Sequence, residues 1–180
     1  MCLLCLLLSG CSSEESVVAG AIEFRAALVQ AGGCSFQAEI QVDFGQTVET
    51  FAVDCQADSD GNTELTVLEP ETLKDITAKV NADSGMVTYD GMAMEFGVLA
   101  DGNVIPAAAP ALVVRCWSSE YIASAGTEDG LYRVTYEKDY EEKMLTVDTW
   151  FKNDIPISAE VCYNGQRVLK LTITEYKMNH

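Results

Sequence analysis

The sequence predicts an α+β domain: a strongly curved antiparallel sheet (half-open β-barrel) of about nine or ten strands, with two helices covering the concave face. Two apolar segments have the spacing of amphipathic helices. Most of the remaining chain alternates apolar and polar residues, with the period of two that half-buried strands show. Turn motifs rich in Gly, Asp and Asn separate these segments. Because strand twist accumulates across a sheet, one of this size must curl.

The first helix is expected from Ser16 to about Gln30, where Gly32-Gly33 ends it. From Cys34 to Phe44 the period changes to two, and a return strand is expected from Val48 to Cys55. Apolar residues mark one face of the helix: Val17, Val18, Ala21, Ile22, Leu28 and Val29.

Shorter strands follow in the middle of the chain. The turn signal Asp60-Gly61-Asn62 precedes the first of them, and Asp90-Gly91 separates the last two. A helical turn is expected from Pro70 to Asp75, and a loop from Asp101 to Pro106. The predicted strands are Thr63–Leu68, Ile76–Val80, Met86–Tyr89 and Met92–Phe96.

The second helix is expected from Ala107 to about Ser124, closed by Gly126. Strands fill the rest of the chain, and Asn164-Gly165 is a strong hairpin signal between the last two. The expected strands are Leu131–Glu137, Met144–Phe151, Ile157–Tyr163 and Gln166–Tyr176, so that the whole sheet follows a meander.

The N-terminal motif Leu8-Ser9-Gly10-Cys11 resembles the lipobox of bacterial lipoproteins. The resemblance implies a signal peptide over residues 1–10, acyl chains such as palmitate on Cys11, a short tether over residues 11–16 and one domain over residues 17–180. No basic residue precedes the short apolar run, so we expect a further basic segment upstream of it. The predicted location is extracytoplasmic, with the chain anchored to the cell membrane by lipid. The alternative is a chance apolar N-terminus on a cytosolic protein.

The charge balance limits the classes of partner. Acidic residues outnumber basic ones 28 to 11, which gives a formal charge of -17. Such a surface repels nucleic acid, whose binding depends on Lys and Arg at the phosphates, and it disfavours electrostatic docking on anionic lipid heads. We therefore expect the chain to contact the membrane only through its lipid anchor. The identity of a partner protein is unknown.

The residues do not indicate an enzyme or a cofactor. The one histidine is His180, the last residue, where a catalytic imidazole is seldom held in position. The mature cysteines lie too far apart in the sequence for a zinc motif. Asp58 to Glu69 matches part of a calcium loop, but Thr63 stands where that loop needs glycine, which favours a solvated hairpin turn instead.

Four cysteines follow the lipobox: Cys34, Cys55, Cys116 and Cys162. An exported location permits disulfides, and the predicted hairpin places Cys34 and Cys55 nearly opposite one another. We predict that pair as a candidate disulfide, ahead of Cys116 with Cys162. The alternative is four free thiols packed as small apolar residues.

Further patterns resemble the bacterial lipoprotein-carrier (LolA/LolB-like) superfamily, as found in uncharacterised lipoproteins of Firmicutes. They are Pro70-x-x-Leu73-x-x-Ile76-Thr77-Ala78, Tyr89-Asp90-Gly91, and a helix with Pro110-Ala111-Leu112 and Trp117 through Tyr121-Ile122. The resemblance implies a half-open barrel whose helices cover a hydrophobic cavity. The soluble carrier of this superfamily has no lipid anchor, whereas this chain has a lipobox.

Two functions are consistent with these patterns. In the first, the domain binds a lipid or other hydrophobic ligand between sheet and helices, with Leu112, Val113, Trp117 and Tyr121 of the second helix lining the cavity. Several Met and aromatic residues could extend that lining or simply form the core. In the second, the core is filled by side chains and the domain is a non-catalytic interaction module of the cell envelope.

Overall fold

A computed structural model of the chain describes residues 12–43, 45, 47–81, 83–100, 103–138 and 145–179. The predicted signal segment, Cys11, Met144 and His180 lie outside the described residues. Within the described ranges, neither helix combines the length and the hydropathy of a membrane-spanning segment.

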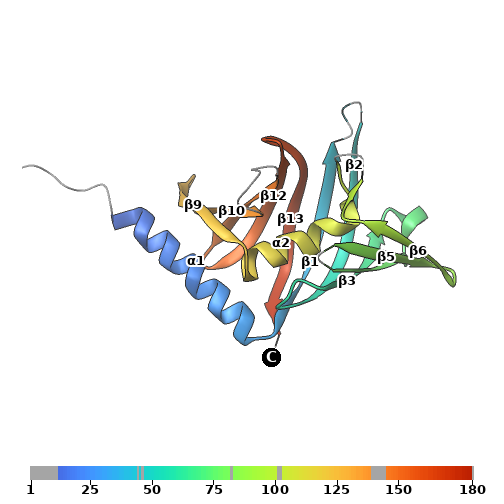
Figure 1. Cartoon of the computed structure of the whole chain (residues 1–180), viewed down its shortest axis with the longest axis horizontal. Coiled ribbons are helices and arrows are strands. Elements are labelled where there is room, and N and C mark those ends of the chain that lie inside the picture. The colour runs from blue at the N-terminus through green and yellow to red at the C-terminus, as the bar shows by residue number, and fades with distance from the viewer. Residues whose placement is uncertain are drawn as a thin grey trace, which may run out of the picture.

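One 11-stranded antiparallel sheet, in the order β6-β5-β4-β3-β2-β1-β13-β12-β11-β10-β9, dominates the fold (Figure 1). It consists of two meanders joined where β1 pairs with β13. The first meander contains β1 (Gly33–Asp43), β2 (Val48–Asp58), β3 (Thr63–Glu69), β4 (Thr77–Val80), β5 (Ser84–Tyr89) and β6 (Met92–Gly97). The second contains β9 (Tyr121–Glu128), β10 (Leu131–Lys138), β11 (Leu145–Lys152), β12 (Ile155–Tyr163) and β13 (Gln166–Met178).

Strand β9 accounts for the difference between the predicted strand number and the observed one. The second helix, α2 (Ala109–Ser118), ends earlier than predicted, and the chain continues as β9 paired with β10. The hydroxyls of Ser118 and Ser119 both donate hydrogen bonds to the carbonyl oxygen of Arg115, and side-chain bonds of this kind compete with the backbone bonds of a helix. Gly126, expected to close the helix, lies opposite Arg133 in the β9–β10 ladder.

Smaller elements lie between the two meanders and beside β3. The predicted helical turn after Pro70 is the 3-10 helix η1 (Glu71–Leu73). The predicted loop after Asp101 instead contains β8 (Asn103–Val104), which pairs with β7 (Leu99–Ala100). A second 3-10 helix, η2 (Pro106–Ala108), leads into α2.

The first helix, α1 (Ser12–Gln30), begins earlier than predicted and includes residues 12–16 of the segment expected to be a tether. Its buried face is also narrower than predicted, because Ile22 and Val29 are 54% and 49% exposed. The buried residues follow the spacing of one helical face: Val17, Ala21, Phe24 and Leu28.

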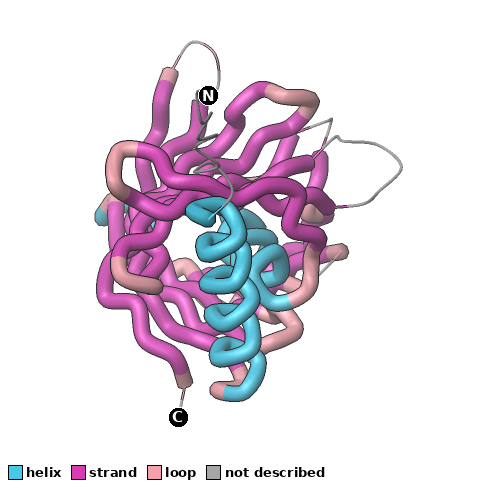
Figure 2. The backbone as a smooth tube through the Cα atoms, turned by 90° about the vertical axis from the view of Figure 1, so that its left-hand side faces the viewer, coloured by secondary structure: helices cyan, strands magenta, loops and turns pink. Residues whose placement is uncertain are grey.

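The sheet curls around the two helices, as Figure 2 shows. The helices pack mainly against β1, β2, β9, β10 and β12 and bury the concave side of that part of the sheet. The start of α1 and the β5–β6 hairpin lie at opposite ends of the longest axis of the molecule (Figure 1).

Candidate ligand- and partner-binding surfaces

The residues predicted to line a cavity lie in two different environments. Leu112, Val113 and Trp117 on α2 are buried in the core, at 4%, 0% and 0% exposure. Tyr121 lies on β9 instead of on the helix and is 48% exposed.

Trp117 fills the space between α2 and the sheet. Its indole nitrogen donates a hydrogen bond of 2.9 Å to the hydroxyl oxygen of Thr149 on β11. Three aromatic rings surround it, those of Phe24, Phe36 and Tyr176, with centroids 5.8, 6.0 and 6.1 Å from the Trp117 ring. Contacts of this kind add to the stability gained from burial alone.

The space beneath α1 is also closely packed. An apolar gap of about 10 Å³ lies between Val17 and Phe24 of α1 and Val134 and Phe151 of the sheet. A gap of this volume is at the lower limit for one water molecule and is far too small for an acyl chain. A ligand cavity between sheet and helices therefore stays a prediction that requires these side chains to move.

An exposed apolar surface lies on the β5–β6 hairpin. The register of the two strands places five apolar side chains on one face, the methionine face: Val87, Tyr89, Met92, Met94 and Phe96. Tyr89, Met92 and Met94 are 51%, 69% and 67% exposed, whereas Phe96 packs against the core. Since Gly85 on the same face is buried, the methionine face continues the concave side of the sheet beyond the helices.

Close contact between Gly85 and Phe96 fixes the base of the methionine face. A Cβ atom on Gly85 would lie 2.2 Å from the Phe96 ring, so only glycine lets the ring lie flat there. Met86 pairs with Glu95 and points to the opposite face of the hairpin.

A second open surface is a groove of about 580 Å³ between α1 and β9. Val18 and Ile22 line it on the helix side, and consecutive residues 119–124 line it on the strand side. Arg25 and Glu137 complete the groove. Among the described strands, only β10 pairs with β9, so the other edge of β9 has no strand partner in that part of the chain.

Arg25 joins α1 to the end of α2. Its guanidinium donates hydrogen bonds to the carbonyl oxygens of Cys116 (3.2 Å), Trp117 (2.8 Å) and Glu120 (2.6 Å). The last carbonyls of a helix have no partner within the helix and carry partial negative charge, which favours a cation there. Arg25 also lies 5.9 Å from the centre of the Tyr136 ring.

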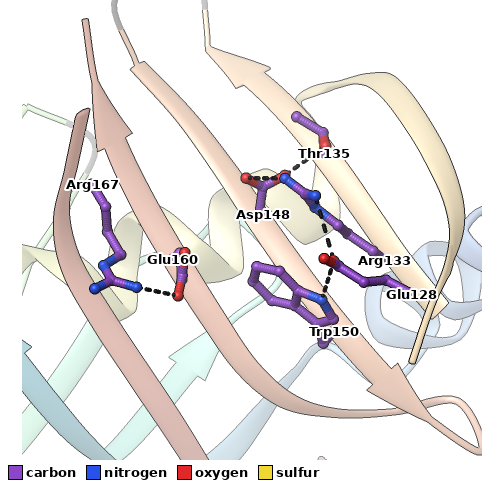
Figure 3. Close-up of polar contacts among 7 residues, drawn as sticks. All are labelled: Glu128, Arg133, Thr135, Asp148, Trp150, Glu160 and Arg167. Carbon is purple, nitrogen blue, oxygen red and sulfur yellow. Dashed lines mark hydrogen bonds and ion pairs between the residues drawn. The ribbon is translucent and has the colours of Figure 1, made fainter. Parts of the chain in front are cut away.

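The convex side of the second meander carries a network of charged side chains (Figure 3). Arg133 donates two hydrogen bonds to Asp148, of 3.2 and 3.0 Å, and Thr135 donates one of 2.6 Å to the same carboxylate. The bonds to Asp148 raise the pKa of Arg133. Glu128 accepts hydrogen bonds from Arg133 and from the indole of Trp150. The network ties β9, β10 and β11 together on the side opposite the core.

Cys34, Cys55, Cys116 and Cys162 are free thiols in this structure. Cys34 pairs with Ala57 and Cys55 with Phe36, so the two cysteines are diagonal neighbours on one face of the β1–β2 hairpin. Diagonal Cα atoms in a sheet are about 7–8 Å apart, slightly beyond the usual range of a disulfide. The predicted Cys34–Cys55 disulfide therefore stays a prediction. Burial raises the pKa of the Cys34 thiol to about 12.

The partial calcium motif forms the turn between β2 and β3. One carboxylate oxygen of Asp58 accepts hydrogen bonds from the backbone nitrogens of Asp60 and Asn62, both 2.9 Å long. The other oxygen accepts a bond of 2.8 Å from the Asn62 side chain. Asp58 thus stabilises a hairpin turn, which is the structure that the sequence favours for this segment.

No family model matches the chain, and no curated protein matches it. Among solved structures, a LolA superfamily protein from Nitrosomonas europaea is similar, with 12% identity, a TM-score of 0.48, and coverage of 93% of this chain and 94% of that chain. A domain named as an outer membrane lipoprotein-sorting protein from Vibrio parahaemolyticus has 9% identity, a TM-score of 0.49, and coverage of 91% and 92%. The lipoprotein LppX from Mycobacterium tuberculosis has 9% identity, a TM-score of 0.40, and coverage of 89% and 93%. Similarity at this level does not assign the chain to a family.

Proposed function

We propose that this chain is an extracytoplasmic lipoprotein, anchored through Cys11, that binds a hydrophobic ligand without chemical conversion. The observation that carries the proposal is the methionine face, where Tyr89, Met92 and Met94 are exposed on the concave side of the sheet. Exposed apolar surface that gathers in one place usually marks a binding site. The ligand would lie on the uncovered part of the concave face, beyond the packed core around Trp117.

The side chains on this face favour a flexible apolar ligand. Methionine has an unbranched, polarizable side chain that adapts to irregular apolar shapes. The register places no charged side chain among the five residues of the face. The chain as a whole carries a formal charge of -17, which repels anionic groups. A neutral lipid or acyl chain therefore fits better than an anionic lipid.

Fluorescence titration of the full chain carrying Cys11→Ser tests this proposal. The probe is an NBD-labelled diacylglycerol, with NBD-labelled palmitate as the anionic comparison. We expect saturable binding that is tighter for the neutral probe. The double change Met92→Gln and Met94→Gln should raise the Kd about tenfold or more, because it removes apolar contact area.

Val48→Gln is the matched control, since Val48 is 63% exposed on β2, outside the methionine face. This variant should leave the Kd of the neutral probe unchanged. Equal loss of affinity in both variants, or no saturable binding to the original chain, would contradict the proposal.

The packed core favours a second function, an interaction module of the cell envelope. Trp117 and its aromatic neighbours occupy the place where a ligand cavity was predicted. In that case the methionine face would bind a protein, and cross-linking at Met94→Cys in cells should give one discrete adduct. Recovery of lipid from the purified chain in native mass spectrometry would favour the first function.

A further inference from the structure

We propose that the open edge of β9 binds an extended, basic segment of a partner protein by strand addition. This site lies in the groove between α1 and β9, on a different surface from the methionine face. The inference goes beyond the proposed ligand function and does not depend on it.

The groove has the form that an added strand needs. One wall is formed by the consecutive residues 119–124, which lead into the edge strand β9. The other wall is α1, where Val18 and the exposed Ile22 offer apolar contacts. A peptide between these walls could pair its main chain with β9 and turn alternate side chains toward the helix.

The polar backbone of an edge strand distinguishes a peptide from an acyl chain as the occupant. Alternate residues of an edge strand direct their N–H and C=O groups away from the sheet. An acyl chain in the groove would remove these groups from water without replacing their hydrogen bonds, which is unfavourable. A peptide main chain supplies matching donors and acceptors.

Charge in the groove favours a basic segment. Glu120 and Glu137 both line it, and Glu120 is paired with Arg115 at 3.1 Å. Glu137 has no ion pair among the described residues. Among the described residues that line the groove, Arg25 is the one cation, and it is bound to three carbonyl oxygens at the end of α2. With a formal charge of -17 on the chain, Lys or Arg on the partner would be attracted to this site.

Panning of a phage-displayed library of random linear decapeptides against the full chain tests the proposal. Peptides that alternate apolar and basic residues should be enriched. Ile22→Lys should raise the Kd of the tightest-binding peptide at least tenfold, because it replaces an apolar contact with a positive charge that repels the basic peptide. Val29→Lys is the matched control, since Val29 is exposed to a similar extent on the same helix but does not line the groove.

Two further measurements identify the binding mode. Hydrogen exchange should show slower exchange of β9 amides when the peptide is bound. N-methylation of alternate peptide nitrogens should reduce affinity at least tenfold, whereas methylation of the intervening nitrogens should not. The proposal is overturned by a failure to enrich any peptide, by equal loss of affinity in the Ile22 and Val29 variants, or by unchanged exchange at β9. Displacement of the peptide by NBD-labelled diacylglycerol would also overturn it, since the groove would then hold lipid.

Discussion

Arg25 shows how one side chain can hold two helices together. Its guanidinium binds three carbonyl oxygens near the end of α2, and these would lose their partner in an Arg25→Met variant. Hydrogen bonds to charged groups contribute about 1.5–3 kcal/mol each, but these three are only part-buried and water can replace some of them. We therefore expect the free energy of unfolding to fall by about 2–4 kcal/mol. Urea denaturation measures the change.

Arg167→Met is the control for this measurement. Arg167 forms an exposed ion pair with Glu160 at 2.8 Å. Ion pairs of this kind contribute about 0–1 kcal/mol. Similar losses in the two variants would show that Arg25 has no special role at the end of α2.

The buried thiol of Cys34 makes stability depend on pH above neutrality. Burial raises the pKa of Cys34 to about 12, above that of an unfolded thiol, so folding favours the protonated form. The stability that the buried Cys34 thiol contributes is fully present below the pKa of this thiol in the unfolded chain. It is lost as the pH rises from there toward 12. Between pH 8 and pH 10.5, we expect the original chain to lose about 2 kcal/mol more than a Cys34→Ala variant.

Reversible urea denaturation at both pH values measures this difference. Cys162→Ala is the comparison, because the Cys162 thiol is only half-buried and should contribute a smaller pH dependence. If the predicted Cys34–Cys55 disulfide forms under oxidising conditions, the pH dependence of Cys34 should disappear there, because a disulfide has no thiol to ionise.

At the residue scale, the four residues predicted to line a cavity do not share one environment. Leu112, Val113 and Trp117 are buried in the core and Tyr121 is exposed on β9, so their role as a ligand lining stays a prediction. Arg25 was missed because a charged residue within a helix carries no periodic signal, and its partners lie more than 90 residues away. The methionine face could be inferred only once the register of β5 and β6 was known.

Two glycines test the packing of individual strands. Gly85→Ala places a Cβ atom against the Phe96 ring, and relief of the clash should cost about 1–3 kcal/mol of stability. Gly126→Ala should be neutral or stabilise by up to about 1 kcal/mol, because the added Cβ atom would meet no non-neighbouring residue within 4 Å and the φ of Gly126 is not positive. Thermal denaturation compares the two variants, and a stable Gly85→Ala variant would contradict the close packing of Phe96.

At the element scale, the alternating segments were predicted well and the region after α2 was not. Ten of the strands arise from a clear period of two or a clear turn signal, which local sequence determines. The apolar residues Tyr121 and Ile122 also fit a continuation of the helix, and Gly126 fits a helix end. The hydroxyls of Ser118 and Ser119 compete with the helical backbone at the end of α2, through hydrogen bonds that composition does not reveal.

The pairing of β1 with β13 makes the two meanders one sheet. Ile40 on β1 is 1% exposed and lies opposite Leu171 on β13. Ile40→Ala should therefore cost about 2–5 kcal/mol and destabilise both meanders together. Fluorescence of Trp150 on β11, measured with Trp117 replaced by Phe, reports on the second meander, and alkylation of Cys55 reports on the first. Both should change at the same urea concentration.

Val48→Ala is the control, because the exposed Val48 side chain contributes little to the core. Separate transitions for Trp150 and for Cys55 would show that the meanders unfold independently. Local sequence patterns carry no direct signal for the β1–β13 pairing, since it joins strands from opposite ends of the domain.

The early start of α1 has a consequence for how the molecule would stand on its bilayer. The residue after Cys11 is already helical, and Val17 is the first described core residue of that helix. At 1.5 Å per residue, the helix rises about 8 Å from Ser12 to Val17. If Cys11 carries the proposed lipid, little flexible chain would separate that lipid from the core. The β5–β6 hairpin, at the far end of the long axis, would reach outward from the membrane that holds the chain (Figure 1).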